Sequence, residues 1–381
     1  MTFSKTIRDP MHGDILLTDL EIRLLDSRPV QRLRRIRQNG LCFLVYPAMN
    51  STRFEHSLGV MYLAGVMAET LKLDEKDLLR VAGLLHDIGH GPLSHTSDAL
   101  MESFGIIHEE NTAKIIREEL ADTLGEYDIS SEEVSDLILG RSRLSEIISS
   151  EIDADKMDYL MRDSYYAGVA YGVIDVERII SSFMMVGDEI IVSEEDLAVI
   201  ESLLISRNLM YQTVYRHHTK RIAECMIREA LLQVSKSDDF SIEDYVRMDD
   251  TGMFTLLRTS EGYPKDIIGR LDERRLFKTV CRQRIKSLDA GVEKIDTAEL
   301  SSSISSAFGI PEGYVLADLP EANLSEFKIK VEHDGTLKTI GEVSSLAKAL
   351  EKSEEDKLTL GVYASPEHVA KFSDFNLNDY L

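Results

Sequence analysis

Three histidines with chemistry-bearing neighbours lie in one short stretch, Leu84-Leu85-His86-Asp87-Ile88-Gly89-His90-Gly91-Pro92-Leu93-Ser94-His95. An apolar run ends at the His86-Asp87 doublet, and two glycines and a proline then interrupt any helix. Imidazole nitrogen and carboxylate oxygen are both good ligands for divalent cations such as Mn, Fe, Zn or Mg. The stretch therefore predicts part of a metal site at the end of a buried helix.

The doublet alone is weak evidence, because a second one occurs at His333-Asp334. There, Gly335 follows between two strand-like runs, which indicates an Asp-Gly hairpin turn. A metal site at His86 and Asp87 needs further ligands, and the candidates are His56 and Asp155. Taken singly, His56 could be a structural histidine and Asp155 an acid at a helix N-terminus. Taken together, the four residues favour a metal site.

Helical periodicity dominates the first 275 residues and would bring these side chains together. We expect helices at about 20–39, 53–71, 77–86, 93–104, 108–120, 131–139, 141–150, 153–166, 175–185 and 195–235. The second of these would carry His56 in its first turn. The third would deliver His86 and Asp87 from the core to a cleft. The predicted fold class is therefore mostly α.

The pattern changes after about residue 275. Alternating apolar residues predict strands at 315–316, 327–331, 337–340 and 358–362, and the run at 301–306 fits either a helix or a linker. We expect two domains, a helical core at 1–275 and a smaller α+β region at 276–381. The metal motif would occupy about 50–165 of the core.

Bulk properties limit the classes of function. The net charge of -24 argues against broad non-specific nucleic-acid binding, which relies on a basic surface. No apolar run reaches the roughly 18 residues that span a bilayer, and the N-terminus lacks the apolar core of a secretory signal. The three cysteines are scattered and predict free thiols in a reducing cytosol. We expect a cytoplasmic enzyme that binds neither membranes nor, stably, nucleic acid.

The first 60 residues carry a basic excess, with nine Lys/Arg against six Asp/Glu. The excess comes from Arg28, Arg32, Arg34, Arg35 and Arg37. These arginines could form a solvated helix face. They could instead form a phosphate-binding patch, because guanidinium groups match phosphate oxygens in geometry.

The ordered set His56, His86-Asp87, Asp155 resembles the HD-domain metal-dependent phosphohydrolases, and more narrowly the deoxynucleoside triphosphate triphosphohydrolases. The resemblance runs from about residue 5 to 230. Its motifs are Asp9-Pro10-Met11-His12-Gly13, Gln31–Gln38, Arg53–Val60, His86–His95 and Ile152–Asp163. It implies an HD-domain helical bundle that binds one divalent metal ion through His56, His86, Asp87 and Asp155. The metal could be Mn, Mg, Fe, Zn or Ni.

The resemblance also implies a reaction. A metal-activated water would attack the α-phosphorus of a deoxynucleoside triphosphate and release deoxynucleoside and triphosphate. By the resemblance, His95 protonates the leaving 5′ oxygen, and His108 with Asp98 orients the water. On chemical grounds His90, His95 and His108 could all move protons near neutral pH. His108 could equally be only the first residue of a helix.

Helical phase groups further candidates for substrate binding. Lys156, Tyr159 and Asp163 recur three and four residues apart and share a face just past Asp155. A second stripe on the long helix consists of Arg207, Tyr211, Tyr215 and His218. Such a stripe could also be core tyrosines with a snorkelling arginine.

The resemblance gives several of these positions a role. Lys156, Arg207 and Arg53 match phosphate contacts, Tyr215 matches a position that stacks on the nucleotide, and Gln38 matches a contact to the sugar 3′-hydroxyl. Three residues depart from the vertebrate pattern: Asn39 replaces a leucine at the sugar, Tyr211 a histidine, and Arg216 a glutamine near the base. Sugar and base preference therefore stay open.

Four residues match the family's guanine-nucleotide activator site between subunits, namely Lys5, Asp26, Gln31 and Arg34. The resemblance thus implies a homo-oligomer, a dimer or tetramer, with dGTP as substrate, activator or both. Two rival functions stay open. One is an HD nucleotidase or phosphodiesterase acting on other nucleotides, which the cationic pair Lys156 and Arg207 disfavours. The other is a nucleotide-sensing regulator with vestigial catalysis, which the complete ligand set disfavours.

Overall fold

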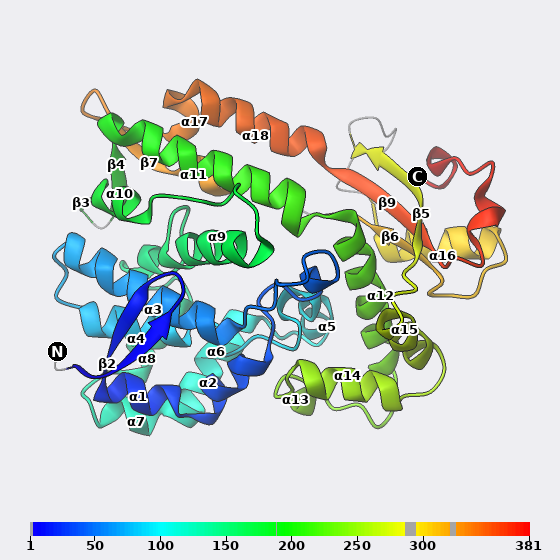
Figure 1. The fold of residues 1–381 in the computed structure, drawn as a ribbon, viewed down its shortest axis with the longest axis horizontal. Coiled ribbons are helices and arrows are strands. Elements are labelled where there is room, and N and C mark those ends of the chain that lie inside the picture. Colours follow the sequence, from blue (N-terminus) through cyan, green and yellow to red (C-terminus); the bar gives the residue numbers. More distant parts are fainter. Residues whose placement is uncertain (1–2, 188, 286–294, 321–324) are drawn as a thin grey trace.

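The computed structural model describes residues 3–187, 189–285, 295–320 and 325–381, and within them the protein is mostly α-helical with three small β-sheets (Figure 1). This confirms the predicted fold class. The helices before residue 275 are α1 (Asp19–Leu25), α2 (Arg28–Arg32), α3 (Arg53–Thr70), α4 (Lys76–Leu85), α5 (Asp98–Ser103), α6 (His108–Ile115), α7 (Ala121–Gly125), α8 (Ser131–Ile138), α9 (Ala154–Ala167), α10 (Val176–Ser181), α11 (Leu197–Met210), α12 (His218–Val234), α13 (Ile242–Tyr245), α14 (Asp250–Thr259) and α15 (Tyr263–Asp272). None of the described helices is both long and apolar enough to cross a membrane.

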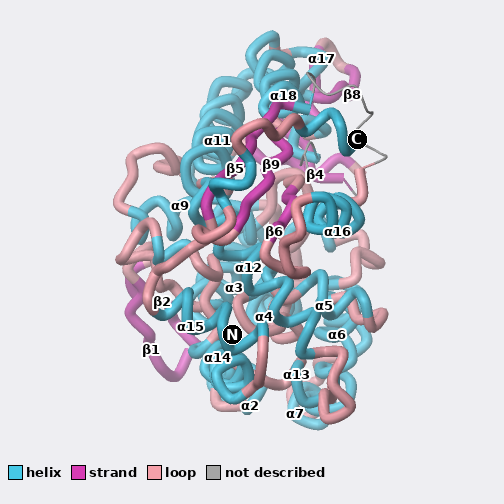
Figure 2. Tube along the Cα trace, turned by 90° about the vertical axis from the view of Figure 1, so that its right-hand side faces the viewer, coloured by secondary structure: helices cyan, strands magenta, loops and turns pink. Residues whose placement is uncertain are grey.

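The later part of the chain adds α16 (Thr297–Ala307), α17 (Ile340–Val343) and α18 (Ser345–Lys357). It also contributes to two of the sheets. β5 (Lys278–Arg284), β9 (Thr359–Ala364) and β6 (Val315–Asp318) form an antiparallel sheet in the order β5-β9-β6. This sheet packs on α16, as Figure 2 shows, and encloses a small apolar core of its own around Ile304 and Val362.

A second sheet joins the two predicted domains. Its strands are β3 (Phe183–Val186), β4 (Glu189–Ser193), β7 (Lys330–His333) and β8 (Thr336–Thr339), in the order β3-β4-β7-β8. β4 runs parallel to β7, with Val192 opposite Val331. In addition, α18 lies along α11 (Figure 1). The C-terminal region therefore packs on the helical core, and the division at residue 275 stays a prediction.

The helices that carry the site are held by burial and by end caps. α3 and α4 pack along each other through their apolar faces, and α9 packs across α3. The side chain of Asp153 accepts a hydrogen bond from the backbone N–H of Lys156 and so caps the start of α9. α9 ends at Gly168, whose φ of +68° suits the left-handed conformation that closes many helices. The antiparallel hairpin of β1 (Phe3–Asp9) and β2 (Gly13–Thr18) precedes them.

Several predicted elements differ from the structure. The helix expected at 93–104 is interrupted, because Leu93 and Ser94 have positive φ and a 3₁₀ turn at 94–96 precedes α5, and the helix expected at 175–185 ends at Ser181, before β3. The helix expected at 20–39 is wrong beyond Leu25, because Pro29 starts a separate short helix and Ile36 is extended where Arg37 pairs with Thr52. The helix at 141–150 is wrong because serine hydroxyls there accept backbone N–H groups, leaving one 3₁₀ turn at 145–147. The helix at 195–235 breaks at residues 216–217. The Asp334-Gly335 turn is confirmed, with φ values of 51° and 73°.

Candidate active site

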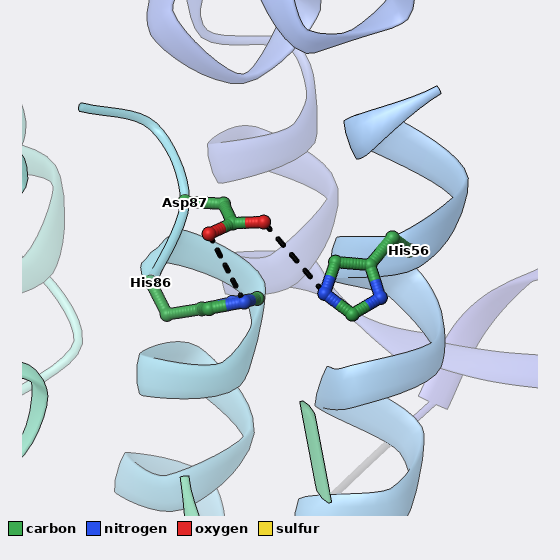
Figure 3. Close-up of side chains that lie close together, drawn as sticks. All are labelled: His56, His86 and Asp87. Atoms are coloured by element: carbon green, nitrogen blue, oxygen red, sulfur yellow. Dashed lines mark ion pairs between the residues drawn. The ribbon is translucent and has the colours of Figure 1, made fainter. Parts of the chain in front are cut away.

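His56, His86 and Asp87 come together between two packed helices (Figure 3). His56 lies in the first turn of α3, and His86 and Asp87 directly follow the last residue of α4. His56 Nε2 lies 3.7 Å from Asp87 Oδ2, and His86 Nε2 lies 3.3 Å from Asp87 Oδ1. The donor atoms thus point at one small region from two elements.

Asp155, near the start of α9, completes the predicted set of ligands. Its Oδ1 lies 2.8 Å from His56 Nε2 and 4.0 Å from His86 Nε2. Ligands bound about 2.1 Å from one ion lie about 3 Å or slightly more from one another, so the spacing fits a shared cation. Burial raises the pKa of Asp155, but the neighbouring His56 outweighs burial and lowers the pKa to about 2. The carboxylate is therefore ionised at neutral pH.

The two imidazoles are oriented by contacts on their other nitrogens. His56 Nδ1 lies 2.9 Å from Asp158 Oδ2, and His86 Nδ1 donates to the carbonyl of Gly83 at 2.8 Å. His86 Nε2 is buried and makes no hydrogen bond, and the buried His56 Nε2 has Asp155 Oδ1, another candidate ligand, 2.8 Å away. Such orphaned atoms are rare in proteins, and second contacts of this kind orient metal-binding histidines. Two imidazole nitrogens and two carboxylates therefore fit a divalent cation.

The electrostatics of this cluster also favour positive charge. Burial lowers the pKa of His56, but the carboxylates of Asp155 and Asp158 outweigh it and raise the pKa to about 10. Burial raises the pKa of Asp87, but Arg53 and the nearby histidines hold it well below its usual range. The ionised carboxylates therefore attract positive charge, and a bound metal ion would take the place of the proton that His56 otherwise holds.

Asp158 is a buried carboxylate beside His56 that the sequence analysis did not single out. It is fully buried and accepts hydrogen bonds from Arg162 at 2.8 Å through both oxygens, and His12 Nε2 lies 2.7 Å from it. Arg162 also donates to Asp9 at 2.9 Å. The available signal was the motif Asp9-Pro10-Met11-His12-Gly13, which carried only the resemblance. The hairpin of β1 and β2 thus supports the ligand His56 through Asp158.

Arg32 binds the backbone of the turn that follows Asp87. Its guanidinium donates to the carbonyls of Ile88 and His90 at 2.8 and 2.7 Å, and to those of Val246 and Met248. Burial lowers the pKa of Arg32 to about 10. Arg32 is therefore neither on a solvated face nor in a phosphate patch, the two readings of the basic segment. Its neighbours Arg35 and Arg37 pair with Asp249 and Asp250 at the start of α14.

A second cluster of ionisable groups borders the first. The rings of His90 and His108 stack with centroids 3.9 Å apart, and His90 Nε2 lies 3.3 Å from Asp87 Oδ1. His95 Nδ1 lies 2.8 Å from Asp98 Oδ2, while its side chain is 71% exposed. The structure thus brings all four predicted proton-transfer candidates beside the ligand cluster. Burial lowers the pKa of His108, but Glu109 outweighs it and raises the pKa.

Arg53 reaches the ligand cluster from the first turn of α3. Its guanidinium donates to Asp87 and, at 2.7 Å, to the hydroxyl of Ser94, and its Nη2 atom is buried without a hydrogen-bond partner. Lys156 is differently placed, because its ammonium bonds the carbonyl of Ser150 and pairs with Asp153 at 3.0 Å. Arg53 therefore keeps one buried donor without a hydrogen bond, whereas the ammonium of Lys156 already has partners at Ser150 and Asp153.

The predicted nucleotide-binding residues meet around Asp163. Tyr215 donates its hydroxyl to Asp163 at 2.8 Å, and the side-chain amide of Asn39 donates to the same carboxyl at 2.6 Å. Burial raises the pKa of Asp163 to about 6, against these two hydrogen bonds. Tyr215 lies edge-on to Tyr159, with ring centroids 6.1 Å apart. The stripe of tyrosines therefore forms a polar wall rather than core packing alone.

The remaining candidates occupy two places. The side-chain oxygen of Gln38 is buried without a hydrogen-bond partner, one residue before Asn39. Gln31 and Arg34 bond each other at 3.1 Å, and Gln31 also donates to the carbonyl of Leu25. The other two activator candidates, Lys5 and Asp26, are exposed. Within the described chain, these four residues lie on the surface and not in the ligand cluster.

Comparisons with known proteins place this geometry in a family. The family model for the HD domain matches residues 53–163, and that for the HD associated region matches residues 174–381. An uncharacterized protein of Methanocaldococcus jannaschii is 38% identical over 99% of this chain and 83% of its own length. The chain belongs to the HD-domain phosphohydrolases. The family resemblance seen in the sequence is thereby confirmed.

Two solved structures resemble this HD-domain phosphohydrolase along nearly its whole length. A hypothetical protein from Aquifex aeolicus superposes with a TM-score of 0.82 at 33% identity, covering 97% of this chain and 98% of that one. A phosphohydrolase from Bacteroides thetaiotaomicron gives 0.77 at 26% identity, covering 95% and 100%. The human deoxynucleoside triphosphate triphosphohydrolase SAMHD1 is 30% identical over 72% of this chain and 55% of its own length.

Proposed function

We propose that this HD-domain phosphohydrolase is a metal-dependent dNTP triphosphohydrolase that converts deoxynucleoside triphosphates to deoxynucleoside and triphosphate. The observation that carries the proposal is that the buried Nε2 atoms of His56 and His86 both face the carboxylates of Asp87 and Asp155, and that the Nε2 atom of His86 makes no hydrogen bond. Relatives named deoxynucleoside triphosphate triphosphohydrolase, from human and from Dictyostelium discoideum, support the choice of substrate.

His56, His86, Asp87 and Asp155 would hold one divalent ion, with its identity open among Mn, Mg, Fe, Zn and Ni. Bound there, the ion offsets phosphoryl charge and lowers the pKa of a water molecule. The chain's own contribution is to orient both imidazoles through Asp158 and Gly83. Arg53 holds Asp87 in position, and its unbonded Nη2 would donate to a phosphate oxygen.

His95 would protonate the leaving 5′ oxygen. Its Nδ1 lies 2.8 Å from Asp98, an arrangement in which Asp98 holds the ring and supports the protonated imidazole. Its high exposure allows the other nitrogen to meet a substrate that enters from solvent. His108 with Asp98 would orient the attacking water, and His90, stacked on His108, could move protons beside them. In this assignment the cluster around His90 and Asp98 transfers protons, and the candidate metal ligands activate the phosphate.

The nucleotide would extend from the phosphates towards Asp163. Asp163 and the unbonded oxygen of Gln38 supply polar groups suited to a sugar hydroxyl. Tyr159, Tyr211 and Tyr215 supply aromatic faces for the sugar and base. Lys156 and Arg207 would add positive charge for the triphosphate.

The surface group of Lys5, Asp26, Gln31 and Arg34 is our proposed guanine-nucleotide activator site. Its position outside the ligand cluster suits a regulatory nucleotide held between subunits of a homo-oligomer, a dimer or tetramer, in the cytoplasm. The activator hypothesis is checked with purified dATP. Full activity without any guanine nucleotide would exclude an obligatory activator.

Product analysis tests the proposed function. The protein is incubated with Mn or Mg and each dNTP and NTP, with and without dGTP, and the products are separated by chromatography. We expect deoxynucleoside and intact triphosphate, and no turnover by the His95→Ala variant beyond about 1% of the wild-type rate. Monophosphate, diphosphate or orthophosphate as the released product would move the protein to another branch of HD chemistry.

A further inference from the structure

Glu354 is a buried carboxylate that reaches the candidate nucleotide site from the C-terminal region. It lies on α18, which runs along α11 (Figure 1), and only 1% of its surface is exposed. One carboxylate oxygen accepts a hydrogen bond from the side-chain amide of Asn208 at 2.7 Å. The other accepts one from Arg216 Nη1, also at 2.7 Å. A buried charge is costly unless it is paired, so these two contacts place Glu354 firmly.

The two partners of Glu354 lie on either side of a single π-turn. Asn208 is near the end of α11, and Arg216 closes the turn 211–215 before α12 begins. Gln212 inside the turn donates to Asn208 Oδ1 at 2.5 Å. π-turns within helices are frequent at functional sites, because they aim side chains that a regular helix would place elsewhere. Glu354 therefore clamps both ends of the turn that carries two of the candidate tyrosines.

Arg216 connects Glu354 to the tyrosines of the candidate nucleotide site. Its guanidinium lies 5.3 Å from the ring centroid of Tyr211, and that of Arg207 lies 4.1 Å from the same ring. Tyr211 in turn meets Tyr215 edge-on, with centroids 5.0 Å apart. A guanidinium over an aromatic face is attracted to it electrostatically, and this attraction favours one orientation of the ring. The chain of contacts thus runs from α18 to the nucleotide wall.

We propose that Glu354 is a positioning residue of the nucleotide site, which sets the orientation of Tyr211 through Arg216. The proposal rests on the proposed nucleotide-binding function. It gives the C-terminal region a role in base binding, since Glu354 itself contacts no substrate. Arg216 stands where the vertebrate pattern has a glutamine, and an uncharged glutamine would not neutralise the carboxylate of Glu354.

The test is the affinity of Glu354→Gln for two ligands that differ only in the base. One is dATP with an imido group between the α- and β-phosphorus atoms, and the other is deoxyribose 5-triphosphate with the same imido group, which lacks the base. Binding is measured by calorimetry on the full chain with Mn present. We expect the variant to bind the dATP analogue about tenfold more weakly and the abasic ligand with unchanged affinity. Glu351→Gln, three residues earlier on α18, is the matched control.

A second variant keeps the inference falsifiable if Glu354→Gln folds poorly. Arg216→Gln removes the other half of the pair, and the double variant should lose no more affinity than either single one. Equal losses for both ligands, additive losses, or unchanged affinity for the dATP analogue would overturn the role of Glu354. Binding does not require turnover, so wild-type protein that binds the analogue but yields other products contradicts only the proposed function. Wild-type protein that does not bind it contradicts both.

Discussion

The metal cluster and the nucleotide wall are built in different ways. The four candidate ligands come from α3, α4 and α9, within about a hundred residues of one another, and each histidine is held by a near neighbour or by Asp158. The nucleotide wall is assembled from Asn39, Asp163, the tyrosines of the turn after α11, and Glu354 of α18. The first is a local motif, whereas the second depends on contacts between distant parts of the chain.

This difference has a functional consequence. The ligand cluster needs fixed geometry, because a cation tolerates little displacement of its ligands, and packed helices supply that rigidity. The nucleotide wall uses hydrogen bonds and cation–π contacts that single substitutions can alter without unfolding the protein. Substitutions in the first region should therefore abolish activity, and those in the second should change affinity, preference or pH dependence.

The largest effect is expected from His86→Ala. The variant loses one of the four candidate ligands, so we expect it to lose bound divalent metal and all activity while keeping its helical circular dichroism. Metal content by mass spectrometry and dNTP turnover measure this. His333→Ala, in the other His-Asp doublet, is the control, because His333 pairs only with Glu194 and Asp334 at the surface. If His86→Ala retained its metal, the cluster would not be the metal site.

The variant Gly59→Ala tests whether the position of Asp158 beside His56 supports metal binding. A Cβ at Gly59 on α3 would lie 1.8 Å from Asp158 Oδ1 and 2.6 Å from an Arg162 nitrogen. Gly59→Ala should therefore displace Asp158, weaken metal binding about 10–100-fold, and cost roughly 1–3 kcal/mol of stability. Calorimetric titration with Mn gives the first quantity, and urea unfolding the second. Gly269→Ala on α15, where a Cβ meets no atom within 4 Å, should leave metal binding as in the wild type.

The pH dependence of stability tests the nucleotide wall. Burial raises the pKa of Asp163 to about 6 in the folded protein, above its ordinary value of 3.8. The native state therefore keeps a proton that the unfolded chain has released, so stability falls as pH rises from about 4 to 6. Relative to Asp163→Asn, the wild type should lose about 3 kcal/mol of unfolding free energy across this range. A difference between the two proteins that is independent of pH would contradict the assigned shift.

The smallest effect is expected from Asn39→Leu. The substitution removes one hydrogen bond to Asp163 and puts an apolar side chain where the vertebrate pattern has one. We expect severalfold better discrimination of dNTP against NTP, about 1 kcal/mol, with little change in the maximal rate. The ratio of kcat/KM for dATP and ATP measures it. An unchanged ratio would show that Asn39 does not read the sugar.

The sequence predicts the local region better than the distant one, for physical reasons. The types and order of His56, His86, Asp87 and Asp155 indicate the ligand set, and helical phase places Lys156, Tyr159 and Asp163 on one face of α9. The sequence does not reveal that Arg32 binds the carbonyls behind the ligand turn, because its charge resembles that of its exposed neighbours. Nor does it reveal Glu354, one of several acids in α18, whose burial arises only when α18 packs on α11.

The central claim is water attack on the α-phosphorus of a dNTP, and hydrolysis in ¹⁸O-labelled water tests it most directly. The products are separated and the oxygen isotopes of each are measured by mass spectrometry. Attack at the α-phosphorus breaks the bond to the 5′ oxygen, so we expect one labelled oxygen in triphosphate and none in the deoxynucleoside. Label in orthophosphate or diphosphate, with nucleotide mono- or diphosphate as the other product, would contradict the account.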